Sequence, residues 1–154
     1  MLSRPTTEQI LLDCRNELLT TIDAALTDPA AKVAIQMLEN VLRNCAERAA
    51  HEIAWMHEEM TAMVAFAERV AASPAGAAGV SSALSTFAAQ PAASLHLDDV
   101  VVAYGLAGEC LSAALDAVVA AGDHRLEADG RELLQQRLAH EQQIMGVWTF
   151  VGRG

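Results

Sequence analysis

The residues of this chain with the most chemical capacity lie together near its C-terminus. The spacing of apolar residues predicts a helix from about residue 123 to about residue 150, whose apolar side consists of Leu133, Leu134, Leu138, Ile144, Met145, Trp148 and Val151. Arg137 and Glu141, four residues apart, project near the middle of that side, and His140 lies at its edge. A cation, a carboxylate and an imidazole among apolar residues are the groups of a ligand pocket, or of a catalytic site that uses His140 and Glu141.

A second interpretation of the same residues is structural. A buried ion needs a partner, because its removal from water is otherwise prohibitively costly. Arg137 is therefore expected to pair with Glu141, or with Glu52, which lies on the flank of the apolar side of an earlier helix. His51, also on that helix, completes the candidate pocket. A closed cavity containing these groups would favour a ligand site, whereas a packed polar bridge would favour a structural role.

The same residues meet the pattern of a bundle metal site only in part. Di-iron and dimanganese bundles use Glu-x-x-His on two helices and single glutamates on two others. This chain has Glu47 and His51 four apart, and the residue three before His140 is Arg137, a cation where a ligand is required. We therefore expect no metal site and no cofactor.

The helix that must position the earlier residues is unusually long. Residues 29–72 contain no glycine or proline after the first position, and one apolar stripe follows them at helical spacing: Ala34, Leu38, Val41, Cys45, Ala49, Ile53, Met56, Met60, Met63, Ala67 and Val70. An unbroken helix of this span is roughly 65 Å long, whereas a compact chain of this size has a radius of gyration of about 15 Å. Either a second protomer covers the overhang or the helix breaks without the usual breaker residues.

Five residues of this helix are candidates for an interface. Exposed tryptophan and methionine are typical anchors of protein contacts, and the helix supplies Trp55, Met56, Met60, Met63 and Phe66. The alternative for the methionines is adaptable core filling. If a second copy covers the overhang, Met60→Glu should weaken association and folding together.

The remaining elements predict an all-α fold. Thr6 and Gln9 fit a capping box before a helix to about Leu26, and Asp28 with Pro29 starts the long helix after a short turn. A glycine, alanine and serine linker at about 73–82 precedes a short helical turn at 83–89. Two further helices are expected at 98–121 and from Asp123 to about residue 150. The prediction is a single domain, 1–154: a bundle of four long helices with a short extra helical turn.

Composition excludes several classes of partner. A net charge of −10 repels nucleic acid and anionic lipid, and the ten basic residues form no cluster. Glu109 and Asp116 interrupt the most apolar stretch, so we expect no membrane span. The three cysteines are scattered among apolar positions, as is typical of reduced thiols. A soluble, cytoplasmic protein is the expectation.

Three segments carry a resemblance to a known group of sequences. Arg4-Pro5-Thr6-Thr7, the hairpin through Asp28-Pro29 and the run LENVLRNCAERAAHEIAWM at 38–56 resemble an uncharacterised bacterial all-helical protein family. More distantly, the first fifty residues resemble small helical proteins encoded beside aminoglycoside-phosphotransferase-like kinases. The resemblance covers about a third of the chain, transfers no catalytic residue and implies an accessory role.

Two functional hypotheses follow from these observations. The first is a non-enzymatic, homo-oligomeric helical bundle, a dimer, that acts as an accessory or protein-interaction module. The alternative is a small-molecule-binding bundle or enzyme with a polar pocket between helices, formed by Arg137, His140, Glu141 and His51.

Overall fold

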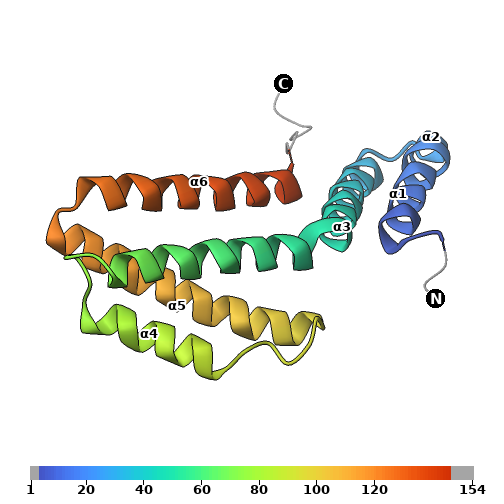
Figure 1. Cartoon of the computed structure of the whole chain (residues 1–154). Helices are drawn as coiled ribbons and strands as arrows, with labels where there is room; N and C mark the ends of the chain where they lie inside the picture. Colours follow the sequence, from blue (N-terminus) through green and yellow to red (C-terminus); the bar gives the residue numbers. More distant parts are fainter. Residues whose placement is uncertain (1–3, 147–154) are drawn as a thin grey trace. The chain divides into compact units, whose positions relative to one another are not determined.

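The computed structural model describes residues 4–146, and over that range the chain is all-helical, with no strand. This confirms the predicted all-α class. The elements shown in Figure 1 are α1 (Thr7–Glu17), a π-helical turn η1 (Leu18–Ile22), α2 (Asp23–Ala25), α3 (Pro29–Ala71), α4 (Ala78–Ala89), α5 (Leu97–Ala121) and α6 (His124–Met145). The helix of 43 residues at Pro29–Ala71 is a single element, so of the two alternatives that the sequence left open, a break within this helix does not occur.

The described residues form two compact units. The first contains residues 4–52 and 140–146, and the second contains residues 53–139. Both α3 and α6 therefore contribute to each unit. The linker expected at about 73–82 lies inside the second unit, where it joins α3 to α4.

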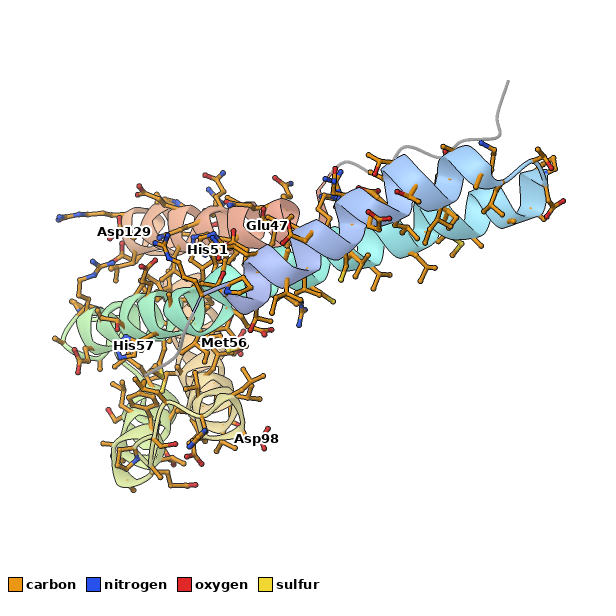
Figure 2. All side chains as sticks on the ribbon, turned by 90° about the vertical axis from the view of Figure 1, so that its right-hand side faces the viewer. Glu47, His51, Met56, His57, Asp98 and Asp129 are labelled. Carbon is orange, nitrogen blue, oxygen red and sulfur yellow. The ribbon has the colours of Figure 1, made fainter. Side chains whose placement is uncertain are left out.

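The first unit is built on a helical hairpin. The capping box is present, because the Gln9 amide donates to Thr6 Oγ1 at 3.2 Å and the Thr6 amide donates to Gln9 Oε1 at 2.9 Å. Asp28 caps α3 by accepting from the Ala31 amide at 2.9 Å. Figure 2 shows α1 running alongside the first half of α3, and Arg15 Nε donates to Glu39 Oε1 at 2.6 Å between them.

The end of α6 also belongs to the first unit. Arg43 Nη2 donates to the Met145 carbonyl at 2.8 Å, and the Asn44 amide, oriented to satisfy its neighbours, donates to the Ile144 carbonyl at 2.7 Å. Gly146 follows in the left-handed region at φ 59°. A Cβ on Gly146 would fall 1.5 Å from Arg43 Nη1. These side chains satisfy the last carbonyls of α6, and the cation of Arg43 lies at the negative end of the helix.

The last helix ends earlier than the sequence predicts. The sequence predicts a helix to about residue 150, but α6 ends at Met145, because Gly146 adopts the left-handed conformation that stops a helix. Trp148 and Val151, expected on its apolar side, lie outside the described residues.

The second unit contains the main hydrophobic core. Four helical segments contribute to it, and its buried members include Met63, Phe66, Ala67 and Val70 of α3, Val80 of α4, and Ala107, Cys110, Leu111, Ala114 and Val118 of α5. Leu126 and Leu133 of α6 pack against these residues. The close approach of α6 depends on Gly130, whose Cβ would lie 2.7 Å from Leu115 Cδ2 and 3.2 Å from Phe66 Cζ.

The helix α4 is longer than the short turn expected at 83–89. It starts at Ala78, within the stretch expected to be linker, and contains 12 residues. The physical reason is tertiary packing: Val80 is fully buried, and Leu84 and Phe87 lie against the core. Figure 1 shows α4 beside α5.

The helix α5 is close to its prediction. It ends at Gly122 in the left-handed region at φ 66°, and Asp123 Oδ1 then accepts from the Leu126 amide at 3.1 Å at the start of α6. Its length and mean hydropathy would also allow it to cross a membrane. In this structure eight of its residues are buried, several of them within the core of the second unit.

Candidate functional site

The apolar stripe of α3 meets two different environments. In the second unit it is covered, since Met63, Ala67 and Val70 are each 0% exposed. In the first unit the same stripe is open. Leu38 is 52% exposed and Val41 is 51% exposed, and the next stripe residue, Cys45, is also classed as exposed. The stripe therefore changes from open to covered along a single face of the helix.

We define the α3 strip as Ala34, Met37, Leu38, Val41 and Cys45. All five side chains are exposed, and Met37, at 60%, is the most exposed of the three large ones. None of the five carries a charge. An uncharged row of this kind along one helix face is typical of a surface that another helix covers.

The other faces of this part of α3 already have neighbours. Ile35 and Ala46 are the two buried hydrophobic residues of the first unit. Glu39 binds Arg15 of α1, and Arg43 binds the end of α6. The α3 strip is therefore the apolar face that remains. The hairpin partner is similarly open, because α1 contains no buried residue and Ile10 and Ile22 are 48% and 43% exposed.

The five predicted interface residues lie nearer the core than the α3 strip does. Met63 and Phe66 are 0% and 1% exposed and belong to the core of the second unit. Met60 packs against the same core, and Trp55 and Met56 are half-buried. Met60 is consequently not on the overhang, and Met60→Glu would test the folding of the second unit rather than association.

A buried polar cluster joins three helices in the second unit. Glu59 of α3 is 7% exposed. The Tyr104 hydroxyl of α5 donates to Glu59 Oε2 at 2.5 Å, and Arg137 Nε of α6 donates to the same oxygen at 3.1 Å. Arg137 Nη2 also donates to the Tyr104 hydroxyl at 2.9 Å. Each member of the cluster therefore contacts both of the others.

The cluster shifts two pKa values in the direction that its geometry dictates. Burial, followed by the hydrogen bond to Glu59, raises the pKa of Tyr104 above its ordinary value. Burial by itself would lower the pKa of Arg137, but its bonds to Tyr104 and Glu59 more than offset this effect and raise that pKa. The phenol is thus held neutral and the guanidinium charged.

This geometry corrects the expected partner of Arg137. The sequence favours Glu141 or Glu52, whereas the structure pairs Arg137 with Glu59. Glu141 is exposed, and Glu52 accepts from Arg48 Nη1 at 2.7 Å. A signal for Glu59 is present in the sequence, because it lies at helical spacing before residues that become fully buried, Met63, Phe66 and Val70.

The two histidines of the predicted pocket are assigned to the first unit, whereas Arg137 is assigned to the second. His51 Nε2 lies 3.9 Å from Glu47 Oε2, and His140 is half-buried. Glu47 also accepts from Gln143 of α6 at 3.4 Å. Within residues 4–146, no group of three or more histidine, cysteine, aspartate or glutamate side chains is placed to hold a metal ion.

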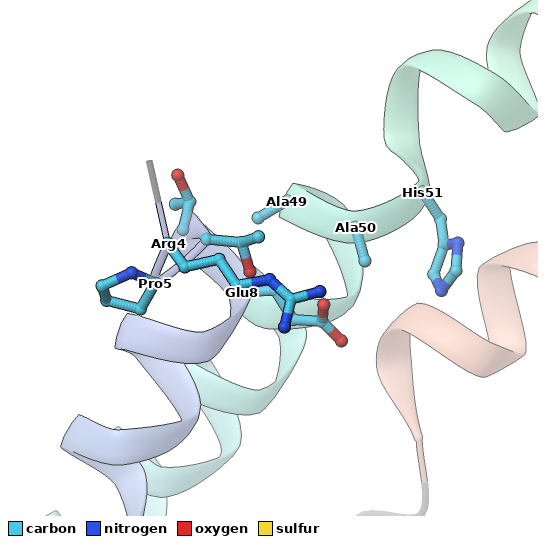
Figure 3. A pocket seen from close by; sticks show the side chains of 8 residues that line it. Arg4, Pro5, Glu8, Ala49, Ala50 and His51 are labelled. Carbon is cyan, nitrogen blue, oxygen red and sulfur yellow. The ribbon is translucent and has the colours of Figure 1, made fainter. Parts of the chain in front are cut away.

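His51 does line a groove in the first unit. The groove has a volume of about 700 Å³ and lies between the start of α1 and residues 49–51 of α3. Figure 3 shows Arg4 and Glu8 on one wall and His51 on the other. It offers a cation, a carboxylate and an imidazole to a ligand, in a more open setting than the sequence-based pocket.

A second groove lies over α5 and α6 in the second unit. Its volume is about 640 Å³, and Gly105, Gly108, Glu109, Asp116 and Arg137 are among its lining residues. The two glycines have open space around them rather than a closely packed helix. The close helix contact is made at Gly130, beside Leu115 and Phe66.

In comparisons with protein-family models, curated proteins and solved structures, no significant match to this chain was found. The features of this chain that bear on its function are therefore the α3 strip, the polar cluster and the two grooves.

Proposed function

We propose that this chain is a non-enzymatic, homo-oligomeric helical bundle that acts as an accessory or protein-interaction module and dimerises through the α3 strip. The observation that carries the proposal is the uncovered part of the α3 stripe. Met37, Leu38 and Val41 are each more than half exposed on a helix whose continuation is fully packed. Full burial of one such side chain is worth about 1.5–3 kcal/mol, so a second copy has a substantial driving force for association.

The polar cluster supports the non-enzymatic part of the proposal. Glu59, Tyr104 and Arg137 satisfy one another, and no buried side-chain nitrogen or oxygen among residues 4–146 lacks a hydrogen-bond partner. A cluster whose members form hydrogen bonds with one another in the absence of a ligand is explained by a structural role, because leaving any member unpaired would destabilise the core. A packed polar bridge is what a structural role of Arg137 predicts, although its carboxylate here is Glu59 rather than Glu141 or Glu52.

The accessory role and the location are part of the same proposal. The resemblance of the first third of the chain to uncharacterised bacterial helical proteins favours an accessory role, and that third includes the hairpin and the α3 strip. The surface proposed for association therefore lies within the segment that carries the resemblance. The proposed cytoplasmic location follows from the composition instead.

A matched pair of substitutions tests the proposal. Val41→Glu places a charge in the α3 strip, and Val102→Glu places the same charge at an α5 valine that is 61% exposed in the second unit. We expect Val41→Glu to shift sedimentation from dimer to monomer at micromolar concentration, and Val102→Glu to leave it unchanged. Equal sedimentation of the two variants would contradict the proposed interface.

The second candidate function is binding of a small molecule. The groove between Arg4 and His51 favours it, because both polar side chains face an open volume of about 700 Å³. A ligand held there would raise the melting temperature of the protein but not of His51→Ala. A thermal-shift screen of small carboxylates and phosphates, made on both proteins, measures this difference.

A further inference from the structure

The α3 strip has an internal symmetry that specifies how a second copy fits. Its two end positions on the stripe are small, Ala34 and Cys45, and its two middle positions, Leu38 and Val41, are large. The spacing from Ala34 to Leu38 equals the spacing from Val41 to Cys45. Reversing the direction of the helix therefore reproduces the same order of small and large positions.

We infer that two copies pair antiparallel through α3, around a two-fold axis between Glu39 and Asn40. Ala34 of one copy then faces Cys45 of the second copy, and Leu38 faces Val41. This inference rests on the proposed dimer and adds its direction and register. A two-fold interface requires such reciprocity, because each contact between two different residues must occur twice.

Charge at the end of the α3 strip favours the antiparallel direction. Arg48 and Glu52 follow Cys45 toward the second unit and bind each other at 2.7 Å. A parallel pair in register would place Arg48 beside Arg48 of the second copy, and like charges at close range repel. The antiparallel pair places Arg48 near the alanines at 30 and 31, and it also sets the two helix dipoles in opposition, which is favourable.

The area available is close to the lower limit for a stable dimer. The stretch from Thr7 to Ala25 is about 28 Å long, and a hairpin of two helices is about 20 Å wide. One face of the hairpin therefore offers roughly 560 Å² on each copy, or about 1,100 Å² in total before side chains interdigitate. Stable interfaces begin near about 1,200 Å² of accessible surface.

Disulfide trapping tests the register, because Cys45 is exposed. In a Cys14→Ser background, which removes the other exposed cysteine, we compare native Cys45, Ala34→Cys with Cys45 retained, and Ala34→Cys combined with Cys45→Ser. Facing cysteines bridge when their Cα atoms lie within about 7 Å. Positions 34 and 45 on one helix are separated by about 16 Å, so they cannot bridge within one copy.

Cys110 is buried and is retained in all three proteins. We expect most of the protein with exposed cysteines at both 34 and 45 to become a covalent dimer under mild oxidation, and the two proteins with one exposed cysteine to remain uncrosslinked. Tryptic peptides 33–43 and 44–48 should be joined, which places one cysteine on each copy. Crosslinking of Cys45 alone would show a parallel pair and overturn the inference. A non-covalent dimer in which none of the three proteins crosslinks would overturn the register but retain the proposed function, whereas a monomer would overturn both.

Discussion

At the scale of single residues, Glu59 is the position where this chain departs furthest from a simple apolar stripe. It lies at helical spacing before Met63 and Phe66, yet it carries a carboxylate into the same core. The cost of burial is offset because Tyr104 and Arg137 both donate to one of its oxygens. The bridge links α3, α5 and α6 and fixes their relative register within the second unit.

Removal of the carboxylate should reveal its role in stability. We expect Glu59→Ala to destabilise the protein by about 3 kcal/mol, because it leaves Arg137 partly buried without its ionic partner. Glu58→Ala is the matched control, since Glu58 is exposed on the same helix and should change stability by less than about 0.5 kcal/mol. Chemical denaturation measures both. If Glu59→Ala and Glu58→Ala both changed the free energy of unfolding by the same small amount, the cluster would not have a structural role.

Tyr104 gives a second prediction, which concerns pH. Burial and the hydrogen bond to Glu59 raise its pKa in the folded state, so the neutral phenol is the form that folding favours. Its contribution to stability is fully present below the unfolded pKa of about 10 and is lost as the pH rises through the folded pKa. We therefore expect alkaline destabilisation that is smaller in Tyr104→Phe.

The pKa of Tyr104 can be measured directly, because the chain has one tyrosine. Ultraviolet absorbance of the tyrosinate, recorded together with helical ellipticity, should give a higher titration midpoint in the folded protein than in denaturant. The same midpoint in both states, with the helices intact, would contradict the cluster geometry.

At the scale of elements, the features that were predictable from the sequence are local ones. The Thr6 and Gln9 capping box, the Asp28 cap and the left-handed Gly122 each depend on a few neighbouring residues, and each is present. The sequence left open whether α3 is broken, and its unbroken course agrees with the lack of glycine and proline after Pro29. Such signals identify helices and their starts without knowledge of the tertiary structure.

The features that were not predictable depend on contacts between helices. The ionic partner of Arg137 is far away in sequence, and nothing local distinguishes Glu59 from its exposed neighbour Glu58 except the side of the helix. The length of α4 depends on the burial of Val80. The close approach between helices is made at Gly130 rather than at Gly105, and the positions of the glycines in the sequence do not distinguish the two.

Those two glycines provide a prediction about helix packing. Gly105→Ala should stabilise the protein by up to about 1 kcal/mol, because its Cβ meets open space and alanine favours the helix. Gly130→Ala gains the same propensity but forces Phe66 and Leu115 to move, so we expect a net loss of about 1 kcal/mol. Thermal unfolding gives the sign of each effect, and a gain in both would contradict the described contact of α6 with the core.

At the scale of the whole molecule, the central feature is one helix that serves two purposes. The part of α3 in the second unit completes a core, whereas the part in the first unit presents the α3 strip. The hairpin buries little apolar surface by itself, since α1 contains no buried residue. The proposed self-association would cover the exposed apolar side chains of residues 34–45 and convert the hairpin into a four-helix arrangement.

The mass of the native protein tests this account most directly. Native mass spectrometry across micromolar concentrations should give twice the 16.3 kDa of one chain, and the dimer should dissociate on dilution in Val41→Glu before it does in the unmodified protein. A species of 16.3 kDa at every concentration, with its helices intact by circular dichroism, would contradict the claim that the α3 strip binds a second copy.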